Sequence, residues 1–177
     1  IFSLRDATRR SVTAGNENVA RRVAEQIGLY VETNVDILQS VAGNLNDTNL
    51  QQSQQDRILK NAVLDFPEFR EITLYDATGA QVASSRAGRS ALQFPQSGIA
   101  FSPTTTLSPI AIDDDFLPTA DVGIKLTHMG ANAGSLVGRI SLEEMWRMVD
   151  RIRVGEQGYA LVIAPDGRLV AHGNPNE

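Results

Sequence analysis

The 177-residue sequence contains no cysteine, and this absence removes several classes of protein at once. Without thiols there is no disulfide framework, no thiolate zinc site and no cysteine nucleophile. Long apolar runs are also missing, because none approaches the ~18 residues that a membrane-spanning helix needs. The formal net charge is −5, and no segment is basic enough to follow a phosphate backbone. We therefore do not expect a nucleic-acid partner.

Motifs of catalysis are scarce as well. The only histidines are His128 and His172, and no G-x-S-x-G nucleophile elbow or glycine-rich phosphate loop is present. Four aspartates, Asp113–Asp115 and Asp121, form an acidic cluster. Their spacing matches no calcium-binding loop, and a run of charge is usually solvated. The sequence therefore predicts a non-enzymatic chain with no catalytic residue, no metal and no cofactor.

What is present first is a long helical pattern from about Leu4 to Leu45. Apolar residues recur on one face of it at intervals of three or four. A helix this long is typical of a stalk, a coiled coil or a docking helix. Two interpretations of its second half stay open: the face packs on its own domain, or it is the seam of a parallel homodimer. The heptad-like seam consists of Val31, Val35, Leu38, Ala42 and Leu45.

A second helix, about Leu50 to Asp65, is predicted to end before Pro67. Beyond it, runs rich in β-branched and aromatic residues predict a sheet that opens with a hairpin around Ala77-Thr78-Gly79. An acidic loop separates the third and fourth of its strands. The five predicted strands are Arg70–Asp76, Ala80–Ser85, Ile99–Leu107, Ala120–His128 and Ser135–Ile140.

The C-terminal part begins with a helix from Leu142 to about Arg153, followed by a second hairpin, Tyr159–His172. The second hairpin matches the first at an offset of 88 residues, with Gly79 over Gly167. Each hairpin follows an amphipathic helix, which favours a tandem repeat of one α+β unit. We expect the second hairpin to open a new module and not to extend the first sheet.

Three stretches resemble one known family: FPEFREITLYDATGAQVASS, VGRISLEEMW and VGEQGYALVIAPDGRLVAHG. They are similar to extracytoplasmic Cache domains, also called PAS-like PDC sensor domains, in their double arrangement. The resemblance implies an α+β fold with a long N-terminal helix, a PAS-like five-stranded antiparallel sheet, a linker helix and the opening hairpin of a second module. It divides the chain into a helical stalk (1–66), a membrane-distal module (67–141) and a linker helix with an incomplete second module (142–177).

The same resemblance implies a ligand-sensing domain on the periplasmic or extracellular face of a bacterial inner-membrane receptor. The parent looks most like a sensor histidine kinase, with a chemoreceptor or a nucleotide cyclase as alternatives. Its cytoplasmic catalytic part would be absent here. A start at Ile1 and a polar, turn-like end also suggest a piece of a longer, membrane-tethered protein.

The predicted ligand site lies within residues 70–140 and prefers an anion. The family's amino-acid binders carry an arginine followed by aromatic residues after the second strand, whereas this chain has RAGRSA there. Where they carry an aspartate for the ligand's amine, this chain has Arg139. Guanidinium groups bind carboxylates in a bidentate manner. The candidate ligand-binding residues are Arg86, Arg89, Lys125, Arg139, Tyr75 and Phe101.

The alternative is a domain that binds no small molecule and only dimerises or contacts a protein partner. A site filled by Phe94, Phe101 and Phe116 would favour that alternative. Convergence of the four cations on one cavity would favour the sensor.

Overall fold

The computed structural model describes residues 2–46, 50–128, 130–152, 160–163, 167 and 169–172, with the backbone alone at residues 2–14, 46 and 169–172. The chain divides into two compact units, residues 33–143 and residues 1–32 with 144–177. The first unit holds the large sheet and is described first. No helix in the described part of the chain is long and apolar enough to cross a membrane.

Two helices precede the sheet, as the sequence predicts. Helix α1 spans Phe2–Asn46 and helix α2 spans Gln52–Asp65. The side-chain oxygen of Gln54 accepts a hydrogen bond from the backbone N–H of Gln51, which satisfies one of the donors left free at the start of α2. The helix ends at Asp65, because Pro67 disfavours helical geometry at the preceding residue, Phe66.

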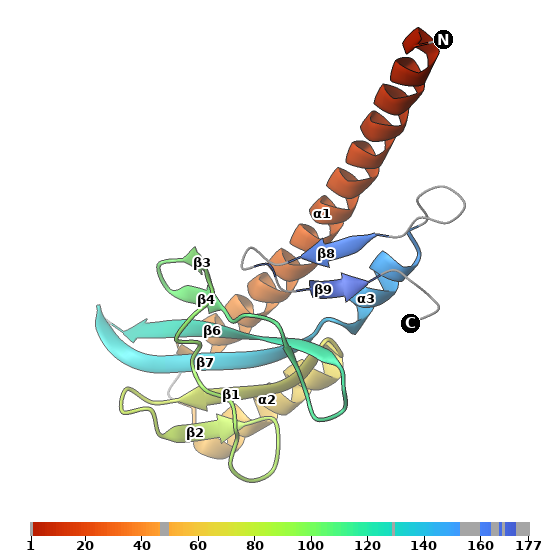
Figure 1. Cartoon of the computed structure of the whole chain (residues 1–177). Coiled ribbons are helices and arrows are strands. Elements are labelled where there is room, and N and C mark those ends of the chain that lie inside the picture. The colour runs from red at the N-terminus through yellow and green to blue at the C-terminus, as the bar shows by residue number, and fades with distance from the viewer. Residues whose placement is uncertain are drawn as a thin grey trace. The chain divides into compact units, whose positions relative to one another are not determined.

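The sheet is antiparallel throughout, in the order β2-β1-β7-β6-β4-β3, with the short β5 also paired to β6 (Figure 1). The path β2-β1-β7-β6-β4 contains the five strands predicted from the sequence. The helices and strands agree with the predicted α+β class. The strands are β1 Phe69–Tyr75, β2 Gln81–Ser84, β3 Ile99–Ser102, β4 Thr105–Leu107, β5 Ala111–Ile112, β6 Pro118–His128 and β7 Ala131–Ser141.

One strand prediction is corrected. Ile99–Leu107 is not one strand but a tight hairpin of β3 and β4, with a turn at Pro103 and Thr104. Proline has no N–H to donate to a ladder, so it stands at the turn between the two strands. The hairpin leaves β3 as one edge of the sheet and places β4 beside β6.

The C-terminal end of α1 packs against one face of the sheet. A Cβ atom at Gly138 of β7 would lie 3.1 Å from the side chain of Leu38, so the absence of a side chain there lets α1 pack close. Next to it, Gln39 donates a hydrogen bond to the hydroxyl of Thr105 on β4, at 3.3 Å. These contacts, together with α2 beside β1 and β2, cover one face of the sheet (Figure 1).

This packing decides between the two interpretations of the heptad-like seam. Val35, Leu38, Ala42 and Leu45 are all buried, and Leu38 has no exposed surface. Only Val31 remains half-buried. The prediction of a dimer seam through these positions is therefore corrected: the seam is part of the core of its own unit, since apolar side chains on the helix meet apolar side chains on the sheet.

The second unit contains the short helix α3 (Glu143–Asp150, which begins one residue before the unit) and the strands β8 (Leu161–Ile163) and β9 (Leu169–His172). The predicted helix started at Leu142 and ran further; Arg153, its expected end, lies outside the described residues, as do Tyr159, residues 164–166 and residue 168. Strands β8 and β9 pair with each other in a sheet of their own. The prediction that this hairpin does not join the first sheet is confirmed for the described residues.

The two hairpins share their register pair by pair. In the first, Leu74 pairs with Ala83; in the second, 88 positions further along, Val162 pairs with Ala171. The neighbouring pairs and the position of the bulge also coincide at the same offset. Gly79 and Gly167 have φ angles of 82° and 85°, a left-handed conformation that glycine adopts without strain. The repeat seen in the sequence is thus also a repeat of backbone geometry.

Candidate functional site

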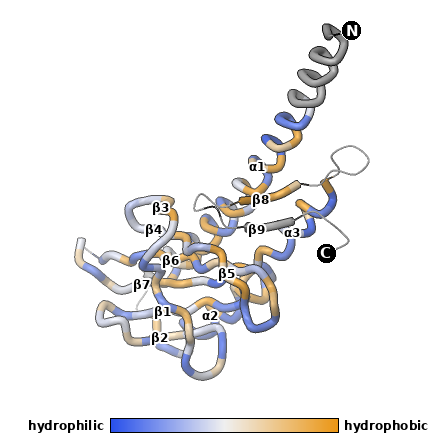
Figure 2. The backbone as a smooth tube through the Cα atoms, in the orientation of Figure 1, coloured by the Kyte–Doolittle hydropathy of each residue, from blue (hydrophilic) through white to orange (hydrophobic). Residues whose placement is uncertain are grey.

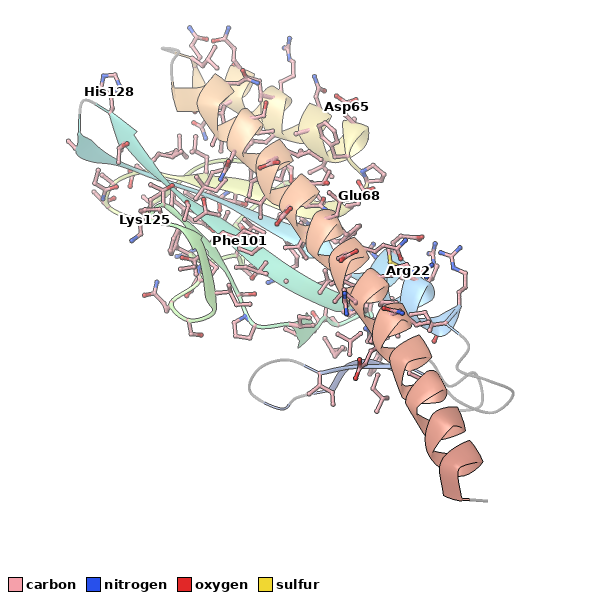
Figure 3. The ribbon with its side chains drawn as sticks, turned by 90° about the horizontal axis from the view of Figure 1, so that it is seen from above. Arg22, Asp65, Glu68, Phe101, Lys125 and His128 are labelled. Atoms are coloured by element: carbon pink, nitrogen blue, oxygen red, sulfur yellow. The ribbon has the colours of Figure 1, made fainter. Side chains whose placement is uncertain are left out.

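The sheet face opposite α1 and α2 is mostly polar. Because paired residues in an antiparallel ladder share a face, the register of β1, β7 and β6 places three rows of side chains there. Lys125 lies on this side of the sheet, away from the helices (Figure 3). The rows are Glu71, Thr73 and Tyr75; Arg139, Val137 and Ser135; and Asp121, Gly123 and Lys125.

The segment between β2 and β3, residues 85–98, crosses this polar face (Figure 1). Its apolar side chains hold it there: Leu92 is buried, and Phe94 and Pro95 lie over Gly123. A Cβ atom at Gly123 would be 2.5 Å from Pro95 and 2.8 Å from the Phe94 ring, so only glycine permits this approach. The hydroxyl of Tyr75 donates a hydrogen bond to the carbonyl of Leu92. We call this segment the covering loop.

Hydrogen bonds from β2 fix the first part of the covering loop. The side-chain oxygen of Gln81 accepts from the backbone N–H of Ser90 at 2.8 Å, and its amide nitrogen donates to the carbonyl of Gly88 at 3.0 Å. One side chain thereby ties two points of the loop to the strand. The loop residues between them, including Arg89, are held near the turn that joins β1 to β2.

That turn is itself ordered by one carboxylate. Asp76 Oδ1 accepts hydrogen bonds from the hydroxyl and the N–H of Thr78, at 2.6 and 2.8 Å, and from the N–H of Ala80 at 3.0 Å. The hydroxyl of Thr78 and the N–H of Ala80 lower the pKa of Asp76 below its ordinary value, because they stabilise the ionised form. Three hydrogen bonds therefore order the turn beside the covering loop.

Between this turn, the covering loop and the sheet lies a cavity of about 680 Å³. Its volume is within the range of small-molecule sites. Tyr75 and Phe94 contribute aromatic surface, and Arg89 is the only charged residue in its lining. The lining residues are Tyr75, Gly79, Ala80, Gln81, Gly88, Arg89, Ser90, Ala91, Leu92, Gln93, Phe94 and Ser135.

Two predicted ligand-binding arginines have carboxylate partners within the chain. Arg139 forms a bidentate pair with Asp121, with N–O distances of 2.7 and 2.9 Å. The hydrogen bonds that Arg139 donates to Asp121 are the main reason that the pKa of Arg139 is raised. Arg86 lies 3.5 Å from the carboxylate of Glu71, which is only 5% exposed and also accepts a hydrogen bond from the hydroxyl of Thr73.

The other predicted residues divide between the cavity and the surface. Tyr75 and Arg89 line the cavity. The ammonium of Lys125 lies over the ring of Phe94, 5.7 Å from its centre, and this cation–π contact helps to hold the covering loop on the sheet. Phe101 is 38% exposed on the edge strand β3 and does not line the cavity. The four cations therefore do not converge on one cavity, and Arg89 alone of them lines it.

Most of the loop residues that complete the cavity, such as Ser90 and Gln93, were not among the residues predicted from the sequence. The available signal was the irregular, glycine-containing stretch directly after the second strand, which had to cross one face of the sheet. Phe94 lines the cavity, whereas Phe116 is 84% exposed and does not. A site filled by the three phenylalanines is therefore not what the structure shows.

The acidic cluster has partners of its own. Asp113 Oδ1 accepts from the backbone N–H groups of Asp115 and Leu117, at 3.0 and 2.8 Å, and Asp121 is held by Arg139. The hydrophilic tip of this loop is blue in Figure 2. Within the described residues, no group of three or more histidine and acidic side chains is arranged to hold a metal ion.

Comparison with known proteins identifies the fold. No protein-family model matches the chain, and no curated protein matches it. Solved structures do: the ligand-binding domain of the Pseudomonas fluorescens chemoreceptor CtaA, in complex with L-isoleucine, has a TM-score of 0.71 and 20% identity over 99% of this chain and 74% of that one. The ligand-binding domain of the Pseudomonas aeruginosa amino acid chemoreceptor PctC, in complex with GABA, has 0.70 and 16%, over 88% and 72%.

A third structure, the ligand-binding domain of the Campylobacter jejuni chemoreceptor Tlp3 with 4-methylisoleucine, has a TM-score of 0.67 and 13% identity, over 89% and 69% of the two chains. This chain therefore has the fold of bacterial chemoreceptor ligand-binding domains, in agreement with the α+β architecture predicted from the sequence. The structures that share the fold are named as ligand-binding domains and not as enzymes, which agrees with the prediction that this chain is non-enzymatic.

Proposed function

We propose that this chain is the extracytoplasmic ligand-sensing domain of a bacterial membrane receptor and that it binds a small molecule in the cavity under the covering loop. The observation that carries the proposal is the cavity itself: a volume of about 680 Å³ with two aromatic walls and one guanidinium, at the polar face of a sheet. The shared fold with chemoreceptor ligand-binding domains supports the same function.

The ligand is a small anion in this proposal. Arg89 lines the cavity, and no ion pair or side-chain hydrogen bond joins it to another residue in the described part of the chain. A free guanidinium at the edge of an apolar cavity is suited to a carboxylate, which it binds through two parallel hydrogen bonds. Lys125 lies on the same side of the sheet and adds positive potential around the site, whereas Glu71 and Asp121 offset the charges of Arg86 and Arg139.

The parent receptor is either a sensor histidine kinase, which the sequence resemblance favours, or a chemoreceptor. The structures that share the fold belong to chemoreceptors, so they support the second candidate. In both, the domain lies in the periplasm and transmits a shift of its terminal helices across the membrane. The expected division was a stalk (1–66), a ligand-binding module (67–141) and the opening of a second module (142–177). Because residues 33–66 belong to the compact unit that contains the sheet, the stalk in this proposal consists of the residues before 33.

A homodimer remains part of the proposal, with the contact moved along α1. Three apolar residues lie about one helical turn apart on one face of α1 and are half-buried: Val19, Val23 and Ile27. The apolar seam positions from Val35 onward are instead buried in the core of the sheet's unit. A parallel pair of α1 helices would join the subunits through residues before 32.

Thermal unfolding of the purified chain with a panel of small carboxylates, amines and amino acids tests the proposed function. A ligand that binds only the native state raises the unfolding temperature, by an amount that grows with the logarithm of its concentration relative to its Kd. We expect a shift with at least one anionic compound and a smaller shift in the Arg89→Gln variant. No shift with any compound of the panel would support the ligand-free interaction domain instead.

A further inference from the structure

We propose that the cavity is built for a carboxylate that carries no ammonium group, and that it discriminates against the α-amino acid with the same carbon skeleton. The inference rests on the proposed function and names the chemical class of its ligand. It follows from which polar groups of the cavity are free and which are already bonded.

Most polar side chains around the cavity are committed to holding the covering loop. The Tyr75 hydroxyl bonds to the Leu92 carbonyl, and both amide atoms of Gln81 bond to the loop backbone. The Ser90 hydroxyl accepts from the N–H of Leu92 at 3.0 Å. Among the described side chains of the lining, Arg89, Gln93 and Ser135 are the polar groups with no hydrogen bond within the chain, so they are fully available to a ligand: one cation and two neutral groups.

No carboxylate lines the cavity, although a bound ammonium group would need one. Asp76 directly follows the lining residue Tyr75 in sequence but is not part of the lining, and its Oδ1 accepts hydrogen bonds from Thr78 and Ala80. Elsewhere on the same face, Asp121 is held in a bidentate pair with Arg139, and buried Glu71 lies against Thr73 and Arg86. Asp121 and Glu71 therefore each already have a cationic partner, and Asp76 is tied to its turn through one of its two oxygens.

The consequence is an asymmetry between the two charged ends of an amino acid. Its carboxylate gains a charge-assisted, bidentate contact with Arg89. Its ammonium group loses water at an aromatic and aliphatic wall and finds no carboxylate among the residues that line the cavity. Partial burial of an unpaired charge is costly, and Arg89 repels the ammonium as well. A carboxylate whose remaining skeleton is apolar avoids both costs and fills the surface of Tyr75 and Phe94.

Matched compounds that differ by one group make the test direct. Isothermal titration calorimetry of the complete 177-residue chain would use 4-methylpentanoate, leucine and 3-methylbutylamine, which share one branched skeleton. Butanoate and 4-aminobutanoate form a second pair. We expect the acid of each pair to bind at least tenfold more tightly than its aminated counterpart, and the amine alone not to bind.

Variants assign the effect to the cavity. Arg89→Gln should weaken binding of the acids at least tenfold, whereas Arg57→Gln, an exposed arginine on α2 outside the cavity, should leave it unchanged. Ser135→Asp places a carboxylate in the lining and should weaken the acid while strengthening leucine. Circular dichroism would establish that each variant is folded.

The outcomes separate the two proposals. Equal or tighter binding of leucine than of 4-methylpentanoate would overturn the preference for ammonium-free carboxylates and leave the sensor function standing. Acid binding that survives Arg89→Gln would show that Arg89 is not the anchor and would overturn the inference in that way. Failure of every acid, amino acid and amine to bind the native chain would overturn the proposed function itself.

Discussion

Arg139 on β7 and Asp121 on β6 stand directly opposite each other in the sheet and form a bidentate ion pair, with distances of 2.7 and 2.9 Å. Their side chains are 32% and 20% exposed, so the pair is partly shielded from water. From sequence alone, Arg139 was a candidate for the ligand's carboxylate. In the structure, the carboxylate that Arg139 binds belongs to Asp121 and not to a ligand. Two of the guanidinium nitrogens are already bonded, so Arg139 has fewer donors left for an external anion.

The Arg139–Asp121 pair should contribute to stability more than to ligand binding. Arg139→Gln leaves a partly buried carboxylate without its main partner, so we expect the free energy of unfolding in urea to fall by about 1–3 kcal/mol. The Asp121→Asn variant and the double variant complete a mutant cycle that isolates the pair's coupling. Unchanged stability in both single variants would mean that the pair contributes nothing measurable.

Gly123 should control whether the covering loop can close over the sheet. Gly123→Val places carbon atoms where Phe94 and Pro95 now lie, so the loop must move outward. We expect a loss of about 1–3 kcal/mol in stability and weaker binding of any ligand that raises the unfolding temperature of the parent chain. Gly43→Ala is the matched control, because nothing lies within 4 Å of the added atom and alanine is the better helix former.

Tyr75→Phe removes the hydrogen bond to Leu92 while keeping the aromatic wall of the cavity. We expect about 1 kcal/mol lower stability and faster amide hydrogen exchange in the covering loop. Phe101→Ala tests the complementary point, since its ring lies on the edge strand outside the cavity. Ligand affinity should be the same in Phe101→Ala as in the parent; a loss comparable to that of Arg89→Gln would place Phe101 in the site.

Single cysteines can map the helix contacts without background, because the chain has no native cysteine. Leu38→Cys should not form a crosslink between subunits, since the side chain at this position has no exposed surface. Val23→Cys should crosslink in a concentrated or membrane-tethered sample if α1 pairs as proposed. A crosslink at position 38 and none at position 23 would restore the seam that the sequence suggested.

Asp76 should make the folded chain sensitive to acid. Its pKa is lowered in the native state, so its ionised form stabilises the fold above its ordinary pKa, and this contribution is lost as the pH falls through the native value. Between about pH 5 and pH 2, Asp76→Asn should therefore lose less stability in urea titrations than the parent. Asp114→Asn, a loop aspartate whose carboxylate makes no described hydrogen bond, controls for the removal of one negative charge.

The secondary structure was largely determined by local sequence. Pro67 ended the second helix, Gly79 marked the first turn, and alternation of apolar residues placed the strands within a few positions of their observed bounds. The repeat at 88 residues was also visible in the sequence, and the structure shows the same register for Leu74–Ala83 and Val162–Ala171, with Gly79 and Gly167 both in a left-handed conformation. The error at Ile99–Leu107 came from reading past Pro103 as though the ladder could continue through it.

The candidate site could be predicted only in part, because its composition depends on distances that the sequence does not state. The sequence by itself supplied the candidates: four cations and the aromatic residues Tyr75 and Phe101. Tertiary structure decided which cation faces a cavity. Asp121 and Arg139 are 18 positions apart and meet through strand register, whereas Arg89 is held beside the cavity by Gln81 and has no carboxylate partner among the described residues. An arginine's availability is set by which carboxylate the folded chain brings within hydrogen-bond distance, and that is a property of packing rather than of local sequence.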